Sequence, residues 1–247
     1  MKTKIKILVL LFSFFQHASI AQFEKGNDLY QKKKFEEAKV VYQQLIATEG
    51  NSFEVLYNLG NTYYKLGDYA QSILYFEKAL KINKDEDVIH NLSVLNQKIK
   101  DKIEPMPQMI LIKWWNSFLN YFSFVQFNVF ALFCVWMLTL CFYFYRLSKE
   151  YSTKKRYFFL TLTLFIISIF SLSIAFSKYK ATTHQDFAII TNDTSYIKSA
   201  PEINSADLFL LHAGTKVSIM NELVDWYQIK LSNGNIGWIL KSELAII

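Results

Sequence analysis

Histidine and cysteine are the side chains in this sequence that would most readily support catalysis or bind a metal ion, and the chain has few of them. They are His17, His90, His184, His212, Cys134 and Cys141. No HExxH metal motif and no GxSxG nucleophile motif is present, and the two cysteines form no CxxC pair. Two cysteines also cannot build a disulfide framework. We therefore expect a chain that is not an enzyme and that holds no cofactor and no metal.

The formal net charge of +6 raises the question of a nucleic-acid partner, and the location of the charge answers it. Residues 22–104 carry 12 basic and 13 acidic groups, and residues 177–247 carry 6 and 7. The excess comes from three lysines near the N-terminus, from Lys113 and from the cluster 146–156. Both candidate globular parts are nearly neutral, so a nucleic-acid partner is disfavoured.

Residues 1–21 have the composition of a secretory signal peptide. Three lysines precede the apolar run 7–15, and the small residues Ser19 and Ala21 stand before a predicted cleavage point after Ala21. The apolar run is short for a spanning helix, which needs about 20 residues. The alternative is an uncleaved anchor helix, and it also leaves the following segment exported.

Residues 22–104 repeat themselves at a spacing of 34. The matching pairs are Gly26 with Gly60, Phe35 with Tyr69, Ala38 with Ser72, and Tyr42 with Phe76. Small residues at the glycine positions allow two helices to approach closely, and the aromatic residues fill the space between them. Because one helical hairpin cannot bury its apolar face alone, neighbouring hairpins must stack.

The second copy, LYNLGNTYYKLGDYAQSILYFEKAL, resembles the tetratricopeptide repeat. The signature positions of that family are filled by Leu59, Gly60, Tyr63, Gly67, Tyr69, Phe76 and Ala79, whereas Ser72 and Lys84 replace the usual Ala and Pro. A third segment, 87–103, repeats the start of the pattern and is followed by two prolines, so we interpret it as a capping helix.

The resemblance implies a binding groove lined by the first helix of each repeat. Carried over by register, the groove residues are Phe23, Asn27, Tyr30, Tyr57, Asn61, Tyr64, Lys65, His90 and Gln97. Asn27 and Asn58 also match two asparagines of the carboxylate clamp that some family members use, but the clamp's basic positions do not match. A carboxylate would lack its charge partner there, so we reject that clamp.

The middle of the chain is typical of a membrane hairpin. Residues 105–124 contain a linker and an amphipathic segment with Trp114 and Trp115, which predicts a helix at the membrane interface. Residues 125–145 and 157–177 are uncharged and long enough to span. The loop 146–156 has five basic residues and one acidic residue, so the positive-inside rule places it in the cytoplasm and both flanks outside.

The two predicted spans contain no Asp, Glu, Lys, Arg or His. Transport and proton relay usually need such groups near the middle of the membrane, so the hairpin is interpreted as an anchor. Cys134 and Cys141 are seven residues apart and share one helix face. We expect them to pack there, because lipid burial disfavours the reactive thiolate.

Residues 178–247 are the predicted C-terminal domain, in which residues 185–247 change to short β-branched runs, with a turn signal at 232–235. The segments YIKSAPEINS, LHAGTKVSIM, DWYQIKL and NGNIGWILKSEL resemble the bacterial SH3-like domain, whose modules bind cell-wall glycan-peptide or protein segments. Trp226 with Tyr227 is the predicted contact surface, and Trp238 is assigned to packing. Lys198 stands where Arg is common, and we expect it at the same ligand contact.

The sequence therefore predicts a multidomain chain: all-α tetratricopeptide-repeat hairpins, a two-helix transmembrane hairpin and a small all-β SH3-like barrel at the C-terminus. This order of modules resembles the BatE family of the Bacteroides aerotolerance operon. The resemblance implies an inner-membrane, periplasm-facing scaffold that acts with von Willebrand-type partner proteins and an associated ATPase in an envelope-stress complex. The alternative is a peptidoglycan-binding envelope protein that acts through the SH3-like domain.

Overall fold

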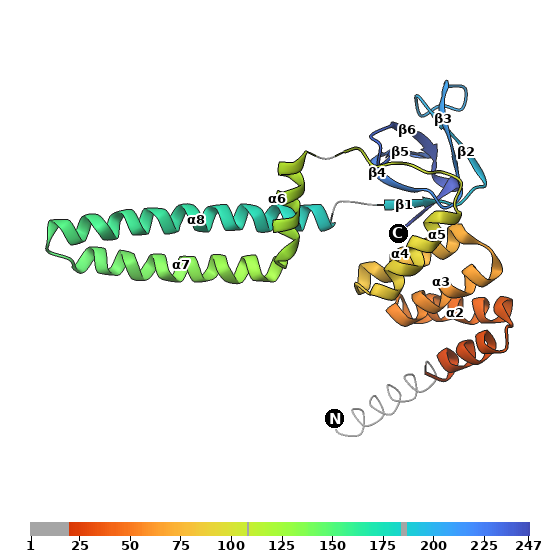
Figure 1. The fold of residues 1–247 in the computed structure, drawn as a ribbon, viewed down its shortest axis with the longest axis horizontal. Helices are drawn as coiled ribbons and strands as arrows, with labels where there is room; N and C mark the ends of the chain where they lie inside the picture. Colours follow the sequence, from red (N-terminus) through yellow and green to blue (C-terminus); the bar gives the residue numbers. More distant parts are fainter. Residues whose placement is uncertain (1–19, 108, 184–186) are drawn as a thin grey trace, which may run out of the picture. The chain divides into compact units, whose positions relative to one another are not determined.

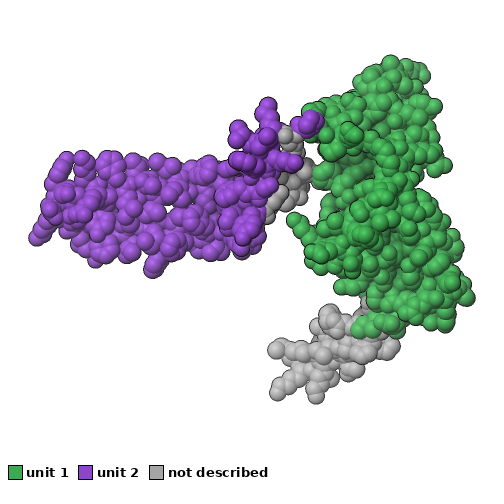
Figure 2. Space-filling view, viewed as in Figure 1, with its two compact units in different colours: residues 1–106, 186–247 green, residues 107–185 purple. Residues whose placement is uncertain are grey.

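The computed structural model describes residues 20–107, 109–183 and 187–247 (Figure 1). Almost all of the predicted signal peptide, and His184, lie outside these residues. The chain forms two compact units, shown in different colours in Figure 2. The first unit joins Met1–Met106 with Asp186–Ile247, and the second is Pro107–Gln185.

The first part of the larger unit consists of helices in antiparallel hairpins. A helix described over 20–31 is followed by α2 (Phe35–Glu49), α3 (Phe53–Leu66), α4 (Tyr69–Ile82) and α5 (Glu86–Lys98). Local sequence sets the boundaries. The Ser52 hydroxyl and the Asp68 and Asp85 carboxylates accept hydrogen bonds from backbone N–H groups in the first turns of α3, α4 and α5. Gly67 ends α3 in the left-handed conformation.

Within each repeat, the two helices pack closely at a glycine. A Cβ atom at Gly60 would lie 2.8 Å from the ring of Phe76, and a Cβ atom at Gly26 would lie 2.6 Å from the ring of Tyr42. Both rings are almost completely buried. The close approach predicted from the 34-residue spacing is therefore confirmed, and it is the same contact in each repeat.

The second unit contains α6 (Ile110–Tyr121), α7 (Phe124–Leu147) and α8 (Tyr151–Thr183). Two stretches of these helices are long and apolar enough to cross a membrane, Val125–Leu147 and Tyr151–Ser177, which agrees with the predicted hairpin.

The helices α7 and α8 meet along small side chains. The buried residues of this seam are mostly small, namely Ala131, Cys134, Cys141, Ser168, Ser171 and Ala175, with the larger Phe127 and Ile174 also buried. The Ser171 hydroxyl donates a hydrogen bond to the backbone oxygen of Phe127, at 3.1 Å. Small residues allow close helix contact in lipid, where no hydrophobic effect drives association. The predicted packing role of the two cysteines is confirmed by their burial.

The β domain, defined as residues 187–247, is an antiparallel sheet of seven strands among the described residues. The strands are β1 (Phe187–Ile190), β2 (Thr194–Lys198), β3 (Asp207–His212), β4 (Lys216–Glu222), β5 (Trp226–Lys230), β6 (Ile236–Leu240) and β7 (Leu244–Ile246), in the order β3-β2-β6-β5-β4-β1-β7. The turn predicted at 232–235 joins β5 to β6, with Gly234 at a φ of 91°.

Strand β1 is buried on both faces. Ala188 and Ile190 point into the core of the β domain, whereas Ile189 joins a cluster formed by α4 and α5. Ala245 and Ile247, near the chain end, pack against the same cluster. The third helical segment has no second helix of its own, so the β domain covers the apolar surface of α4 and α5.

Gly214, in the turn between β3 and β4, lies where the β domain contacts the helices. Its φ is +91°, and an added Cβ atom would lie 2.7 Å from Cγ2 of Ile99. Gly67 has a similar φ of +82° but has no atom within 4 Å of an added Cβ. We predict that Gly67→Ala costs on the order of 1 kcal/mol from backbone strain, and that Gly214→Ala costs roughly 1–3 kcal/mol more from overpacking.

Thermal unfolding of the full chain in detergent, with each variant beside the wild type, measures this difference. Equal destabilisation by the two substitutions would mean that the β domain does not press against the repeats.

Candidate functional site

The four aromatic residues predicted to line the groove are part of the helical core. Phe23 and Tyr30 pack against the buried cluster of the first repeat, and Tyr57 and Tyr64 pack against the cluster of α4 and α5. The ring of Tyr57 lies 5.8 Å from that of Phe76, measured between centroids. All four side chains are half-buried, so their alteration would disturb packing as well as any groove contact.

Asn27 is used inside the fold. Its side-chain oxygen accepts hydrogen bonds from Asn58 Nδ2, at 2.9 Å, and from the Tyr42 hydroxyl, at 2.8 Å. The two asparagines that resemble the carboxylate clamp therefore bond to each other and tie adjacent repeats together. Burial raises the pKa of Tyr30, and the neighbouring Tyr57 raises it further.

Three of the predicted groove residues are exposed, so they are not needed for core packing. Lys65, His90 and Gln97 are exposed, and Asn61 is half-buried. Lys65 lies in the last turn of α3, while His90 and Gln97 lie seven residues apart on α5, close to one face of that helix. These three residues form what we call the groove rim, and they are the part of the predicted site that is most accessible to a partner.

Tyr63, one of the signature positions of the repeat, occupies a packing position. Its side chain is buried, it stacks on Tyr75 with centroids 5.4 Å apart, and its hydroxyl accepts a hydrogen bond from Gln43 at 2.8 Å. Burial is the main reason that its pKa rises to about 12. Tyr63 therefore holds α3 against α2 and does not line a groove.

The predicted contact surface of the β domain needs a correction. Trp226 is half-buried, but Tyr227 is only 8% exposed and belongs to the core. Successive side chains of a strand point to opposite faces, so these neighbours on β5 cannot form one outer surface. Lys198 forms an ion pair with Asp207 at 2.7 Å and donates to the Ser205 backbone oxygen, so its charge is balanced within the domain.

Asp101, just after α5, joins the repeats to the β domain. Its carboxylate accepts hydrogen bonds from the His212 backbone N–H at 2.6 Å and from the Thr215 hydroxyl at 2.7 Å. The other carboxylate oxygen lies 2.7 Å from His212 Nδ1. Partial burial acts to raise the pKa of Asp101, but the hydrogen bonds from His212 and Thr215 outweigh it and hold the pKa below its usual value.

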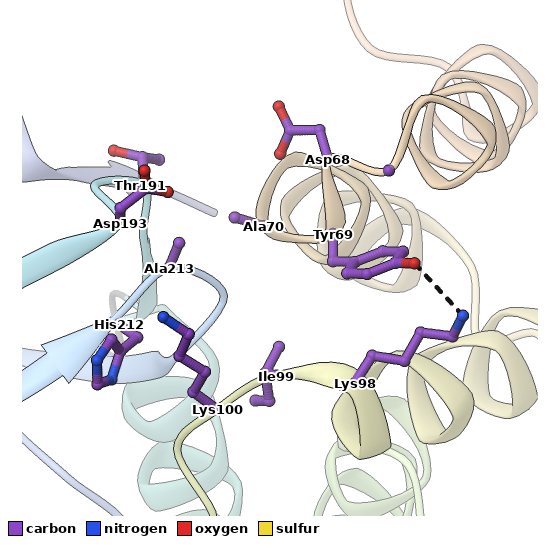
Figure 3. Close-up of a pocket in the computed structure, with 11 residues that line it drawn as sticks. Asp68, Tyr69, Ala70, Lys98, Ile99, Lys100, Thr191, Asp193, His212 and Ala213 are labelled. Atoms are coloured by element: carbon purple, nitrogen blue, oxygen red, sulfur yellow. Dashed lines mark hydrogen bonds between the residues drawn. The ribbon is translucent and has the colours of Figure 1, made fainter.

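A cavity of about 360 Å³ opens beside this contact (Figure 3). Its walls come from the turn between α3 and α4, from the end of α5, and from the β1–β2 and β3–β4 turns of the β domain. Lys98, Lys100, Asp193 and His212 bring charged or polar groups to its lining. No sequence pattern indicates this cavity, because its walls come from segments that are far apart in the sequence.

Three profiles of known families match parts of the chain. A profile described as tetratricopeptide repeat matches residues 53–86, and one described as TPR repeat matches residues 26–67. A profile described as bacterial SH3 domain matches residues 193–245. The chain carries tetratricopeptide repeats and a bacterial SH3 domain. No curated protein matches the chain. The repeat and SH3 matches leave out α5 beyond Glu86, Asp101 and β1, so much of the contact between the two domains lies outside both family patterns.

We predict a pH-dependent contribution of Asp101 to stability. Its folded-state pKa lies below the unfolded value of about 3.9, so its stabilising effect is fully present above that pH and is lost as the pH falls through the folded pKa. Asp101→Asn should cost roughly 1.5–3 kcal/mol at neutral pH, the usual range for a hydrogen bond to a charged group. The difference from wild type should shrink below about pH 4.

Chemical unfolding of both proteins from pH 3 to pH 7 measures the effect. Glu77→Gln is the matched control, because the pair of Glu77 with Lys216, at 2.6 Å, also joins the repeats to the SH3 domain but is more exposed. That variant should lose at most about 1 kcal/mol. Asp101→Asn with wild-type stability at pH 7 would contradict the role assigned to Asp101.

Proposed function

We propose that this protein is a membrane-anchored, non-enzymatic scaffold that presents its repeats and its SH3 domain as one rigid platform in the periplasm. The observation that carries the proposal is the shared core of the two domains. Ile189 of the SH3 domain is completely buried among residues of α4 and α5. Partners bound to the two domains would therefore be held at a fixed separation, which is what a scaffold requires.

The same contact supports the topology. The repeats precede the hairpin in sequence and the SH3 domain follows it, yet the two form one compact unit. A chain that crosses a membrane twice returns to its starting side, so a two-span hairpin is consistent with this unit. The loop 146–156 is strongly basic, which favours the cytoplasm for the loop and the periplasm for the platform.

The helix α6 supports the anchor. Its apolar side chains Ile110, Leu111 and Trp114 are each more than 60% exposed. Leu119 and Phe122, at its far end, pack against Phe127 and its neighbours at the open end of the hairpin. An apolar helix surface with two tryptophans, attached to the end of two spans, fits the interface between lipid and water.

The partners proposed here follow the resemblance to the BatE family. We infer that the platform binds von Willebrand-type proteins and an associated ATPase in an aerotolerance or envelope-stress complex. The exposed groove rim of Lys65, His90 and Gln97 is the surface we assign to this contact. The SH3 domain is the alternative surface, with peptidoglycan as its ligand.

We predict that the platform and the basic loop lie on opposite sides of the membrane. Ser152, near the start of α8 in the basic segment 146–156, and Asn204, in the SH3 domain, are both exposed and are each replaced by a single cysteine. In intact cells with a permeable outer membrane, an impermeant thiol reagent should label position 204 and spare position 152. The native cysteines are buried in the hairpin and are replaced by alanine in this background. The reverse labelling pattern would place the platform in the cytoplasm.

We predict that the groove rim carries partner capture. The triple substitution Lys65→Glu, His90→Ala and Gln97→Ala should reduce co-purification of the von Willebrand-type proteins at least tenfold, because accessible polar and charged residues are replaced. The melting temperature should stay close to that of wild type, since exposed substitutions usually cost under about 0.5 kcal/mol.

The matched control changes exposed residues of α2, a second helix of a repeat. Glu37→Lys, Val40→Ala and Gln44→Ala should leave capture unchanged. If the groove triple captures every partner and Trp226→Ala does not, the SH3 domain is the binding surface. Isolated sacculi incubated with the purified full chain then decide whether peptidoglycan is its ligand.

A further inference from the structure

The hairpin of α7 and α8 has a groove on its surface, close to the loop that joins the two helices. The groove has a volume of about 380 Å³ and lies toward the end of the hairpin opposite α6 (Figure 1). Both helices line it, and four of its lining side chains are aromatic: Phe142, Tyr145, Phe158 and Phe165. Its volume falls within the range of small-molecule sites, roughly 300–1,000 Å³.

The aromatic lining disfavours another transmembrane helix as the occupant. Phe142, Phe158 and Phe165 are each 50–52% exposed, so the hairpin itself does not cover them. Helices in lipid associate closely through small residues, but small residues of this hairpin such as Ala131 and Ser171 are already buried in the α7–α8 seam. A hydrocarbon chain is thin and flexible, so it can lie between large rings where a helix cannot approach closely.

A cation lies at the loop end of the groove. The Nζ atom of Lys154 lies 5.2 Å from the ring centroid of Tyr145, and the centroid of that ring lies 6.3 Å from the centroid of Phe158. Lys154 is one helical turn before Phe158 on α8, so the two side chains share one face of the helix. Lys154 forms no ion pair with another described residue, and Glu150 accepts a hydrogen bond from the Thr153 hydroxyl at 2.8 Å.

The charge at this end of the hairpin favours an anionic head group. Residues 146–156 carry five basic groups and one acidic group. A phosphate oxygen accepts a strong, charge-assisted hydrogen bond from an ammonium group, and basic pockets between transmembrane helices on the cytoplasmic side bind anionic lipid head groups. An unpaired ammonium group beside an apolar groove therefore matches both parts of a phospholipid.

We propose that this groove binds one anionic phospholipid, with an acyl chain along the aromatic rings and the phosphate at Lys154. The inference rests on the proposed membrane anchor, because lipid reaches the groove only when the hairpin lies in a bilayer. It gives the hairpin a second role. A lipid that binds the folded hairpin stabilises it by mass action, so the stability of the anchor depends on the anionic lipid content of the membrane.

Native mass spectrometry of the full chain in detergent tests the proposal, with phosphatidylglycerol and phosphatidylcholine of identical acyl chains as the two probes. The wild type should bind phosphatidylglycerol more tightly by roughly fivefold, the ratio expected for one cation near an anionic lipid surface. Lys154→Gln should lower the binding of phosphatidylglycerol to the level of phosphatidylcholine. Lys154→Arg should keep the preference, because it keeps the charge.

Two matched controls separate this groove from the rest of the hairpin. Arg156 is also exposed, but it lies about 200° around α8 from Lys154, so Arg156→Gln should keep the preference. Leu162→Trp fills the groove and should weaken the binding of both lipids. Leu172→Trp changes a similarly exposed leucine of α8 outside the groove and should leave both unchanged.

Three results would overturn the lipid site. They are equal binding of the two lipids by the wild type, equal losses in Lys154→Gln and Arg156→Gln, and capture of a transmembrane protein in place of lipid by a photo-crosslinker at position 162. Alkaline carbonate extraction of membranes tests the anchor separately. Release of the protein by carbonate refutes the anchor, whereas a protein that stays in the membrane but shows no lipid preference refutes the lipid site alone.

Discussion

Burial of one isoleucine between two domains is the contact on which the larger unit depends. The third helical segment supplies α5 but no second helix, so the apolar surface of α4 and α5 needs another cover. Ile189 provides it from strand β1, with Ala245 and Ile247 beside it. A fully buried isoleucine contributes about 1.5–3 kcal/mol, which is a large share of the stability of an ordinary domain. The repeats and the SH3 domain are thus parts of one folding unit.

Apolar contact alone would not fix the orientation of the SH3 domain on the helices. Apolar burial is non-directional, so it would allow the SH3 domain to slide over the helices. Asp101 limits this freedom, because its three hydrogen bonds need the His212 backbone, the His212 ring and the Thr215 hydroxyl in one arrangement. Gly214 lies between these two residues and touches Ile99, so the same short turn supplies both the polar and the apolar contact.

Patterns that repeat along the chain were predictable, and contacts between distant segments were not. The 34-residue spacing predicted the packing of Gly60 against Phe76, and the absence of charge predicted both long helices. Nothing in the local sequence distinguishes Asp101 from the other acidic residues around it, because its hydrogen-bond partners lie more than 100 residues further along the chain. The prediction that Tyr227 lies on the contact surface is wrong, because strand alternation places it on the face opposite Trp226, in the core. One sequence signal did indicate the contact between the repeats and the SH3 domain. The uninterrupted apolar run of β1, Phe187–Ile190, is typical of a strand covered on both faces.

The position of the hairpin in the sequence has a mechanical consequence. Residues 107–185 are inserted between two segments that share a core, so the hairpin is connected to the platform at both of its ends. A single linker would allow the platform to rotate freely about one point, whereas two connections restrict that rotation. Separation of the repeats from the SH3 domain would have to expose Ile189 and leave the Asp101 carboxylate without its donors, which costs more than the bending of a linker. Signals that reach this platform are therefore expected to move it as a whole or to act at the cavity where its two domains meet.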